Sequence, residues 1–239
     1  MVAKTFGQVL EARLQSGPGQ PLVTFYDDVS GERTELSVTT YANWVAKTAG
    51  VFVDDLGLDT GDRAAVDLPT HWLGPVFLGA AWLAGLTVTD GPRAEAVVQG
   101  PDGSGIEGDQ RLGCALLPFA VASREPMADG VLDFGTLWPG QPDAFVGLPA
   151  GPDEQATEGR SQGALLDHAR SLEYAAGERV LTDLNPVTVE GRDLFLGTLV
   201  GGGSVIWVAR PDQQRWSGRA SSERATRMVR VAGSQPPRS

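Results

Sequence analysis

Apolar residues recur along this chain at helical spacing and at strand spacing in turn, which predicts helices alternating with buried strands. Residues 6–14 carry an apolar helical face, 22–26 predict a strand, and 33–36 predict its hairpin partner. Ser37 is a typical cap for the helix that follows and that Gly57 closes. One face of that helix is formed by Tyr41, Trp44, Val45, Thr48 and Val51.

The stretch between Asp67 and Asp90 contains no Asp, Glu, Lys or Arg and approaches the length of a membrane span. Several prolines and glycines interrupt it, and so does His71, which lies near a strand end and is interpreted as a helix-start residue. A strand over 64–68, a buried helix over about 71–84 and a buried strand over about 86–89 account for this stretch better. We therefore expect no membrane span.

The rest of the chain continues the alternation. Further strands are expected at 94–99, 112–118, 144–148, 179–184 and 204–208, with helices at 161–175 and 190–199. Loops are expected at 100–109 and at 123–143, the second packed down by Phe134 and Trp138. Apolar strands separated by helices indicate an α/β fold with mostly parallel sheet(s) flanked by helices.

The charge of the chain is distributed unevenly. The formal net charge is −11, yet the residues from Pro211 onward hold six Arg against two acidic residues. We therefore divide the chain into a domain over 1–210 and an Arg-rich, partly ordered segment over 211–239, with a short helix, a strand at 228–231 and a frayed end at 234–237. The acidic body argues against nucleic acid, whose phosphates it would repel. The Arg-rich segment either attracts an anion or a partner, or is simply solvated.

Cysteine and histidine usage excludes several chemistries. The one cysteine, Cys114, lies in an apolar run and is expected to be a buried, inert thiol. One thiol builds neither a disulfide framework nor a zinc cluster, and the first residues lack the apolar stretch of a signal peptide, so we expect a cytoplasmic protein. The spacing of the two histidines gives no metal site, and no Gly-x-Ser-x-Gly motif is present.

Three short motifs follow one another in order. The first is a strand and a capped helix leading to Gly-Asp-Arg, the second joins Leu-Pro-Thr to Trp-Leu-Ala-Gly, and the third joins Gly-Glu-Arg-Val-Leu to Gly-Gly-Gly-Ser-Val. They occupy residues 34–37 with 56–66, 68–70 with 82–85, and 177–181 with 201–205.

In this order and spacing, over about 30–210, the motifs resemble the AMP-forming adenylating enzymes: acyl-CoA synthetases, peptide-synthetase adenylation domains and luciferases. The resemblance implies the first part of the large N-terminal domain of these enzymes, with parallel sheets flanked by helices. Such enzymes activate a carboxylate with ATP, release pyrophosphate and hold an acyl-adenylate.

The family's phosphate loop, S-G-T-T-G-x-P-K-G before a helix with T-H, aligns without gaps with residues 155–163, followed by Asp167-His168. Ala156 replaces its first glycine, Glu158 its second threonine and Gln162 its lysine. The resemblance implies a degenerate nucleotide-binding loop. Its candidate residues are Thr157, Gly159, Arg160, Gly163 and His168.

Physical chemistry makes this loop a poor phosphate site. Loss of glycine at Ala156 restricts the backbone, and Gln162 supplies no cation. A Glu158 carboxylate about 4 Å from a phosphate oxygen would cost about 1 kcal/mol in water and about 4 kcal/mol at a partly buried surface. The helix dipole contributes about 0.3–1 kcal/mol and does not reverse this. One alternative gives the role of the lysine to Arg160. For His168 the alternative is a histidine packed on a helix face with one hydrogen bond.

In the family, the adenine pocket, the acidic Mg²⁺ ligand, the ribose-binding Asp and the catalytic Lys lie later in the chain than Ser239. We therefore expect no catalytic residue and no cofactor, and interpret the chain as a non-catalytic binding or interaction module. The apolar face that packs against the remainder of a full enzyme is expected to meet a second copy, forming a homodimer, or another protein.

Two alternatives stay open. One is a partial acyl-CoA synthetase or ligase that binds nucleotide or acyl-CoA, uses ATP and Mg²⁺, and needs a second chain for adenylation. The other is the binding of a different small anion at the loop around Gly159.

Overall fold

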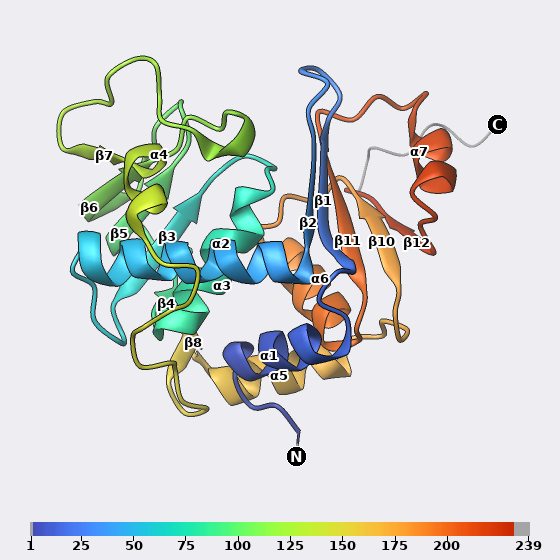
Figure 1. The fold of residues 1–239 in the computed structure, drawn as a ribbon, viewed down its shortest axis with the longest axis horizontal. Coiled ribbons are helices and arrows are strands. Elements are labelled where there is room, and N and C mark those ends of the chain that lie inside the picture. Colours follow the sequence, from blue (N-terminus) through green and yellow to red (C-terminus); the bar gives the residue numbers. More distant parts are fainter. Residues whose placement is uncertain (1, 232–239) are drawn as a thin grey trace.

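The computed structural model describes residues 2–231, which form two mostly parallel sheets with helices packed between and beside them (Figure 1). One sheet has the strand order β12-β10-β11-β1-β2, and the other has the order β7-β6-β5-β3-β4-β8-β9. The first is built from β1 (Pro21–Asp27), β2 (Arg33–Ser37), β10 (Arg179–Thr182), β11 (Ser204–Ala209) and β12 (Arg227–Val229). The second is built from β3 (Arg63–Asp67), β4 (Thr87–Val88), β5 (Arg93–Gln99), β6 (Glu107–Gly113), β7 (Val131–Asp133), β8 (Gln155–Thr157) and β9 (Arg160–Ser161).

All strand pairs are parallel except the two hairpins β1–β2 and β8–β9. This confirms the expected α/β class with mostly parallel sheets. The helices are α1 (Phe6–Ser16), α2 (Val38–Gly50), α3 (Leu73–Ala84), α4 (Phe134–Leu137), α5 (Gln162–Ser171), α6 (Val189–Val200) and α7 (Trp216–Ser222). A π-helical turn over Val51–Asp55 continues α2, and two short 3-10 turns lie at Pro118–Ala120 and Trp138–Gly140.

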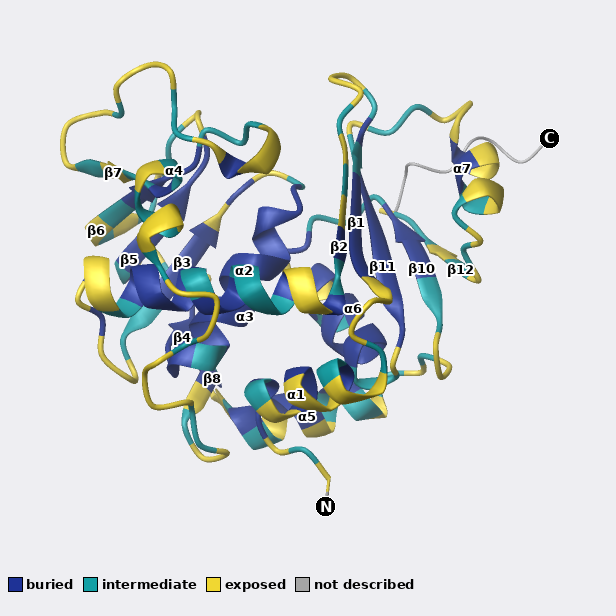
Figure 2. Cartoon of the chain, viewed as in Figure 1, coloured by how far each residue is buried: buried dark blue, intermediate teal, exposed yellow. Residues whose placement is uncertain are grey.

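One continuous hydrophobic core joins the two sheets. Figure 2 shows α3 almost entirely buried, as the uncharged run in the sequence predicted. Tyr41 of α2 donates its hydroxyl to the carbonyl of Pro75 in α3 at 2.8 Å, which ties the two helices together. A Cβ on Gly79 would lie 2.4 Å from that same hydroxyl, so the absence of a side chain at position 79 allows this close approach. Among residues 2–231, no helix has the length and apolar content needed to cross a bilayer.

Most elements predicted from periodicity are confirmed, including the β1–β2 hairpin and the Ser37 cap, whose hydroxyl accepts from the Thr40 amide at 3.1 Å. Cys114 is buried as expected, and burial raises the pKa of its thiol well above the usual range. Phe134 is buried in the core, while Trp138 is half-buried with its ring centroid 4.5 Å from that of Trp44.

Three predictions between 100 and 148 are wrong. The strand expected at 112–118 lies earlier, as β6, because Leu116 adopts a left-handed backbone conformation and Pro118 follows it. β6 therefore includes the last residues of the predicted loop 100–109. Most of its residues are polar, so an apolar pattern does not predict this strand. Residues 144–148 form no strand and leave Val146 84% exposed. The expected loop 123–143 contains β7 and α4.

The Arg-rich segment folds onto the acidic body up to residue 231, and the frayed end expected at 234–237 lies outside the described residues. β12 pairs with β10, and α7 packs Trp216 against a small apolar cluster on the outer face of that sheet (Figure 1). Arg219 pairs with Asp28, and Arg230 pairs with Asp183 at 3.3 Å. Cations of residues 211–231 thus neutralise carboxylates of the same chain.

Candidate functional site

Residues 155–161, which align with the phosphate loop, form a hairpin fixed to the core. β8 extends the sheet beside β4, and Glu158 and Gly159 make the turn, with Gly159 in the left-handed region at φ +77°. Ala156 is fully buried, and its carbonyl accepts a hydrogen bond from the Trp82 indole at 3.0 Å. A Gly at position 156 would keep this carbonyl but remove the buried methyl group, so the Ala156 side chain contributes to the stability of the hairpin.

The amide groups at the start of α5 are already occupied. Gln162 donates to the carbonyl of Glu154 at 2.8 Å, Gly163 to the carbonyl of Pro152 at 2.9 Å, and Ala164 to the Ser161 hydroxyl at 3.3 Å. These are the first-turn donors that a helix N-terminus would offer to a phosphate. Within the described residues, protein oxygens already accept from all three.

The side chain of Gln162, which stands where the family has lysine, is fully buried. Its oxygen accepts from the Phe6 amide at 3.1 Å, and its nitrogen donates to the Trp82 carbonyl at 2.9 Å. It therefore joins α1 to α3 and does not face solvent.

A small cavity of about 290 Å³ lies beside the hairpin and is lined mainly by charged groups. We call it the hairpin cavity; its polar lining is Asp90, Thr157, Glu158, Arg160, Arg192 and Asp193. Glu158 accepts from the Thr89 hydroxyl at 2.5 Å, and Arg192 donates to both carboxylate oxygens of Asp90. Among residues 2–231, Arg160 is the guanidinium of this cavity with no ion-pair partner. Three carboxylates therefore face two guanidiniums.

The structure brings only some of the sequence candidates together. Thr157 and Arg160 line the hairpin cavity, and Gly159 lies at the turn beside it. Gly163 is held in the first turn of α5 by its bond to Pro152. His168 lies in the last turn of α5, where its Nε2 is 3.0 Å from an oxygen of Asp193 on α6.

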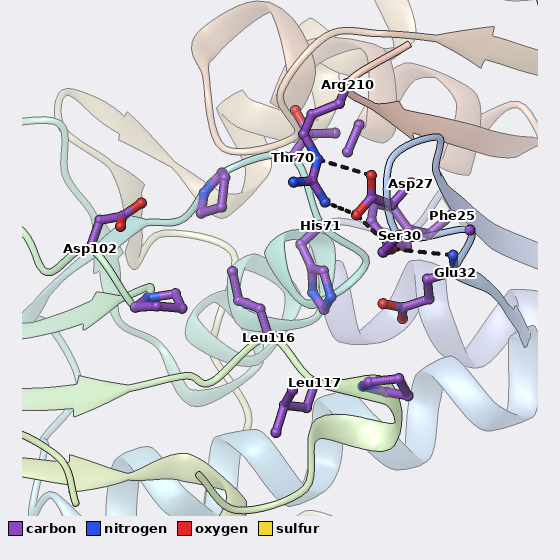
Figure 3. Close-up of a pocket in the computed structure, with 15 residues that line it drawn as sticks. Phe25, Asp27, Ser30, Glu32, Thr70, His71, Asp102, Leu116, Leu117 and Arg210 are labelled. Atoms are coloured by element: carbon purple, nitrogen blue, oxygen red, sulfur yellow. Dashed lines mark hydrogen bonds and ion pairs between the residues drawn. The ribbon is translucent and has the colours of Figure 1, made fainter. Parts of the chain in front are cut away.

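A second and larger cavity lies where the carboxyl ends of strands from both sheets meet. We call it the inter-sheet crevice; it has a volume of about 780 Å³ (Figure 3). It opens beyond the ends of β1, β3 and β11, the position where open α/β sheets bind ligands. Its lining includes the apolar Phe25, Leu116 and Leu117 and the polar Asp27, His71 and Arg210.

An ion pair closes one side of the crevice. Arg210, directly after β11, donates to both carboxylate oxygens of Asp27, the last residue of β1 (Figure 3). Burial alone would raise the pKa of Asp27, but hydrogen bonds from Arg210 and Ser30 outweigh it and lower the pKa to about 2. Asp27 is therefore ionised and already paired.

His71 lies in the wall of the crevice just before α3 and is only 4% exposed. Burial lowers the pKa of its ring to about 3, so the imidazole is neutral at physiological pH. Nδ1 accepts from the Leu73 amide at 3.3 Å, and the ring meets Phe25 edge-on at 4.8 Å between centroids. Nε2 has no hydrogen-bond partner among the described residues.

Comparison with known proteins defines the family. This chain is similar to a "TIGR03089 family protein" of Mycobacterium tuberculosis, with 30% identity over 238 residues, 93% of this chain and 97% of the relative. The chain belongs to the TIGR03089 family. No family model matches it.

Solved structures show the fold of this TIGR03089 family chain. It is similar to a fatty acyl CoA synthetase of Mycobacterium tuberculosis (TM-score 0.69, 15% identity) and to the N-terminal domain of FACL13 from that organism (TM-score 0.70, 14% identity). It is also similar to acetoacetyl-CoA synthetase from Streptomyces lividans (TM-score 0.75, 17% identity). These matches cover 93%, 93% and 95% of this chain and 48%, 62% and 42% of those chains. The resemblance to the N-terminal part of the adenylating enzymes is thereby confirmed at the level of fold.

The crevice also concentrates backbone strain. Five described residues other than glycine have positive φ: Leu116, Phe119, Ala120, Arg210 and Arg224. Leu116 and Arg210 line the crevice, and Phe119 and Ala120 directly follow Pro118, which also lines it. Each such conformation costs on the order of 1–3 kcal/mol and persists where the surroundings enforce it, typically at functional sites.

Sequence reasoning did not find this crevice. Its polar residues come from three distant segments, and neither Asp27 nor Arg210 stands in a motif. The one available signal in the sequence is His71, which lies in an otherwise uncharged run directly after a buried strand and just before a helix.

Proposed function

We propose that this TIGR03089 family chain is a non-catalytic binding module built on the N-terminal part of the adenylating-enzyme fold. The observation that supports this most strongly is the occupied start of α5. The amides of Gln162, Gly163 and Ala164 all donate to protein oxygens. A triphosphate would have to displace these bonds before it gained any of its own.

The charge of the hairpin cavity supports the same proposal. A nucleotide phosphate placed there would meet Glu158, Asp90 and Asp193, against Arg160 and an Arg192 that is already paired. Adenylation depends on positive charge arranged around the reacting phosphoryl group, whereas this cavity has a carboxylate excess.

Two measurements on the full chain test the proposal. Isothermal titration calorimetry with ATP and Mg²⁺ is expected to show no binding up to millimolar nucleotide. Pyrophosphate exchange with a panel of carboxylic acids is expected to stay at the background of a heat-denatured sample. Exchange above that background, or an ATP affinity in the micromolar range, would refute the non-catalytic role.

A partial acyl-CoA synthetase or ligase is the second candidate, favoured by the Arg160 guanidinium at the start of β9, which has no ion-pair partner among residues 2–231. In that case the chain binds nucleotide or acyl-CoA and requires ATP, Mg²⁺ and a second chain. A thermal-shift screen with ATP, AMP, CoA and acyl-CoAs separates the two candidates. Stabilisation by a nucleotide that Arg160→Gln abolishes and Arg93→Gln retains would favour this second function.

We further propose that the module works in the cytoplasm as a homodimer that uses the edge strand β12. Within the described residues, β12 pairs with β10 alone, and Met228 on it is 56% exposed. A sheet edge offers unpaired backbone groups to a second copy. Size-exclusion chromatography with light scattering is expected to give twice the chain mass of 25.2 kDa. A monomer at tens of micromolar would contradict this.

A further inference from the structure

The inter-sheet crevice has the size of a ligand site and carries an unbalanced charge. Its volume of about 780 Å³ falls within the range of about 300–1,000 Å³ typical of small-molecule pockets. Three carboxylates line it, those of Asp27, Glu32 and Asp102, against one guanidinium, that of Arg210. Because Arg210 donates to both carboxylate oxygens of Asp27, these two charges neutralise each other. The carboxylates of Glu32 and Asp102 are left without a counter-charge.

Both of these carboxylates are held in place by a turn. Within the part of the chain that the structure describes, neither has an ion-pair partner. Half-buried Glu32, at the β1–β2 turn, accepts a hydrogen bond from the Thr34 hydroxyl at 3.0 Å. Exposed Asp102 lies in the turn after β5, which the Gly103 amide closes by donating to the carbonyl of Gly100 at 3.0 Å.

The two carboxylates lie on opposite sides of the crevice. Figure 3 shows Asp102 on one side and Glu32 on the other, with Leu116 and the ring of His71 between them in this view. Glu32 belongs to a turn of the first sheet and Asp102 to a turn of the second, so the two sheets hold them apart. Among residues 2–231, no group of three or more His, Cys, Asp and Glu side chains is placed to hold a metal ion. The two charges therefore require two separate cationic groups.

The wall between the two carboxylates is largely apolar. It is lined by Phe25, Leu116 and Leu117 together with three prolines, and such a surface favours contact with methylene groups over contact with water. A ligand that suits the whole crevice has an apolar middle and a positive charge at each end. An anion would meet two uncompensated carboxylates, and an uncharged molecule would gain nothing from either of them.

We propose that the inter-sheet crevice binds a linear aliphatic diamine, with its methylene chain along Leu116 and Leu117 and one ammonium group each at Glu32 and Asp102. The proposal deepens the proposed function, on which it rests, by naming the class of ligand that the module holds. Both ion pairs stay partly solvated, so each adds a modest amount to the affinity and is weakened by salt.

Three probes with one carbon skeleton test the chemical class: octamethylenediamine, octylamine and octamethylene glycol. Titration of the full nitrogen-15-labelled chain at pH 7, followed by NMR, measures the three affinities. Octamethylenediamine is expected to bind, with octylamine roughly threefold weaker and the glycol roughly tenfold weaker. Raising NaCl from about 20 mM to about 300 mM should weaken the diamine more than the glycol, because salt screens exposed ion pairs.

Two isosteric variants locate the charges. Glu32→Gln is expected to weaken binding of octamethylenediamine by roughly three- to fivefold, and Asp102→Asn by roughly two- to threefold, since Asp102 is more exposed. Neither variant should change the affinity for the glycol. Glu11→Gln, a surface change on α1, is the control and is expected to leave all three affinities unchanged.

The amide signals of the unaltered chain locate the ligand without any variant. Octamethylenediamine is expected to shift the signals of Glu32, Asp102 and Leu116. The signals of Thr157 and Arg160 should stay in place, although the hairpin cavity that they line also has a carboxylate excess. Shifts confined to the hairpin cavity, equal affinities for the three probes, or no binding at millimolar diamine would each overturn the proposal.

The two proposals fail in different ways. If none of the three probes binds and ATP does not bind either, the ligand class is wrong while the non-catalytic role stands. If pyrophosphate exchange is detected, the non-catalytic role is wrong whatever the crevice binds.

Discussion

The guanidinium of Arg219 in α7 donates to both oxygens of the Asp28 carboxylate, which is 3% exposed, just beyond the end of β1. The same guanidinium lies over the ring of Tyr26, with 4.4 Å to the ring centroid. The pair therefore anchors the Arg-rich segment to the first sheet. At least one arginine of the positively charged C-terminal segment thus serves a structural role by pairing with Asp28.

Breaking this pair is expected to be costly. Arg219→Met leaves the Asp28 carboxylate buried without its main partner, which typically costs about 3–5 kcal/mol of unfolding free energy. Urea denaturation of the native chain and of Arg219→Met at pH 7 measures this difference in unfolding free energy. Arg93→Ala, which removes an ion pair with both side chains 57% exposed, is the control and is expected to change stability by less than about 1 kcal/mol. Equal effects of the two variants would show that α7 is not anchored in this way.

The Asp27–Arg210 pair predicts a specific loss of stability in acid. In the folded chain the pKa of the Asp27 carboxyl is about 2, below the ordinary value of 3.8. The stabilisation is therefore complete above about pH 4 and is lost as the pH falls toward 2. We expect a contribution of about 1–2 kcal/mol, reduced by the solvent exposure of Arg210. The difference in unfolding free energy between the native chain and Asp27→Asn should be present at pH 7 and shrink by pH 2.5. A difference independent of pH would contradict the prediction.

The contact of Gly79 with Tyr41 predicts a non-additive pair of mutations. Gly79→Ala places a methyl group 2.4 Å from the Tyr41 hydroxyl and 2.8 Å from the Phe6 ring, and is expected to cost about 1–3 kcal/mol through overpacking. Tyr41→Phe alone loses the bond to Pro75, about 0.5–1.5 kcal/mol. Since the second change removes the clashing oxygen, the double variant should be more stable than the sum of the two costs predicts. If the cost of the double variant in urea unfolding equals the sum of the two single costs, the proposed clash between the added methyl group and the Tyr41 hydroxyl is wrong.

The thiol of Cys114 should report global unfolding. It is 3% exposed, and burial raises its pKa well above the usual range, so the reactive thiolate is scarce in the folded chain. Labelling with Ellman's reagent at pH 8 is expected to be slow without denaturant and rapid in urea beyond the unfolding midpoint. Rapid labelling of the native chain would mean that the end of β6 opens locally.

Periodicity and capping were sufficient for most local structure. The helix after Ser37, the buried helix α3 and the strands β1, β5 and β11 all follow from side-chain spacing, because each element buries one face or both within a short window. The sequence also shows Glu158 and Gln162 where the resembling family has threonine and lysine, and the degenerate state of residues 155–163 remains a prediction. What the sequence did not give was the use of Gln162 as a buried joint between α1 and α3.

The sequence by itself thus determined the alternation of strands and helices and their caps, because these depend on neighbours a few residues apart. Tertiary structure decided the strand pairing of the polar β6, the docking of Arg219 on Asp28, and the crevice that brings Asp27, His71 and Arg210 together. Those relationships join segments far apart in the chain, and no local preference encodes them. They arise because the carboxyl ends of two parallel sheets are brought to the same side of one shared core.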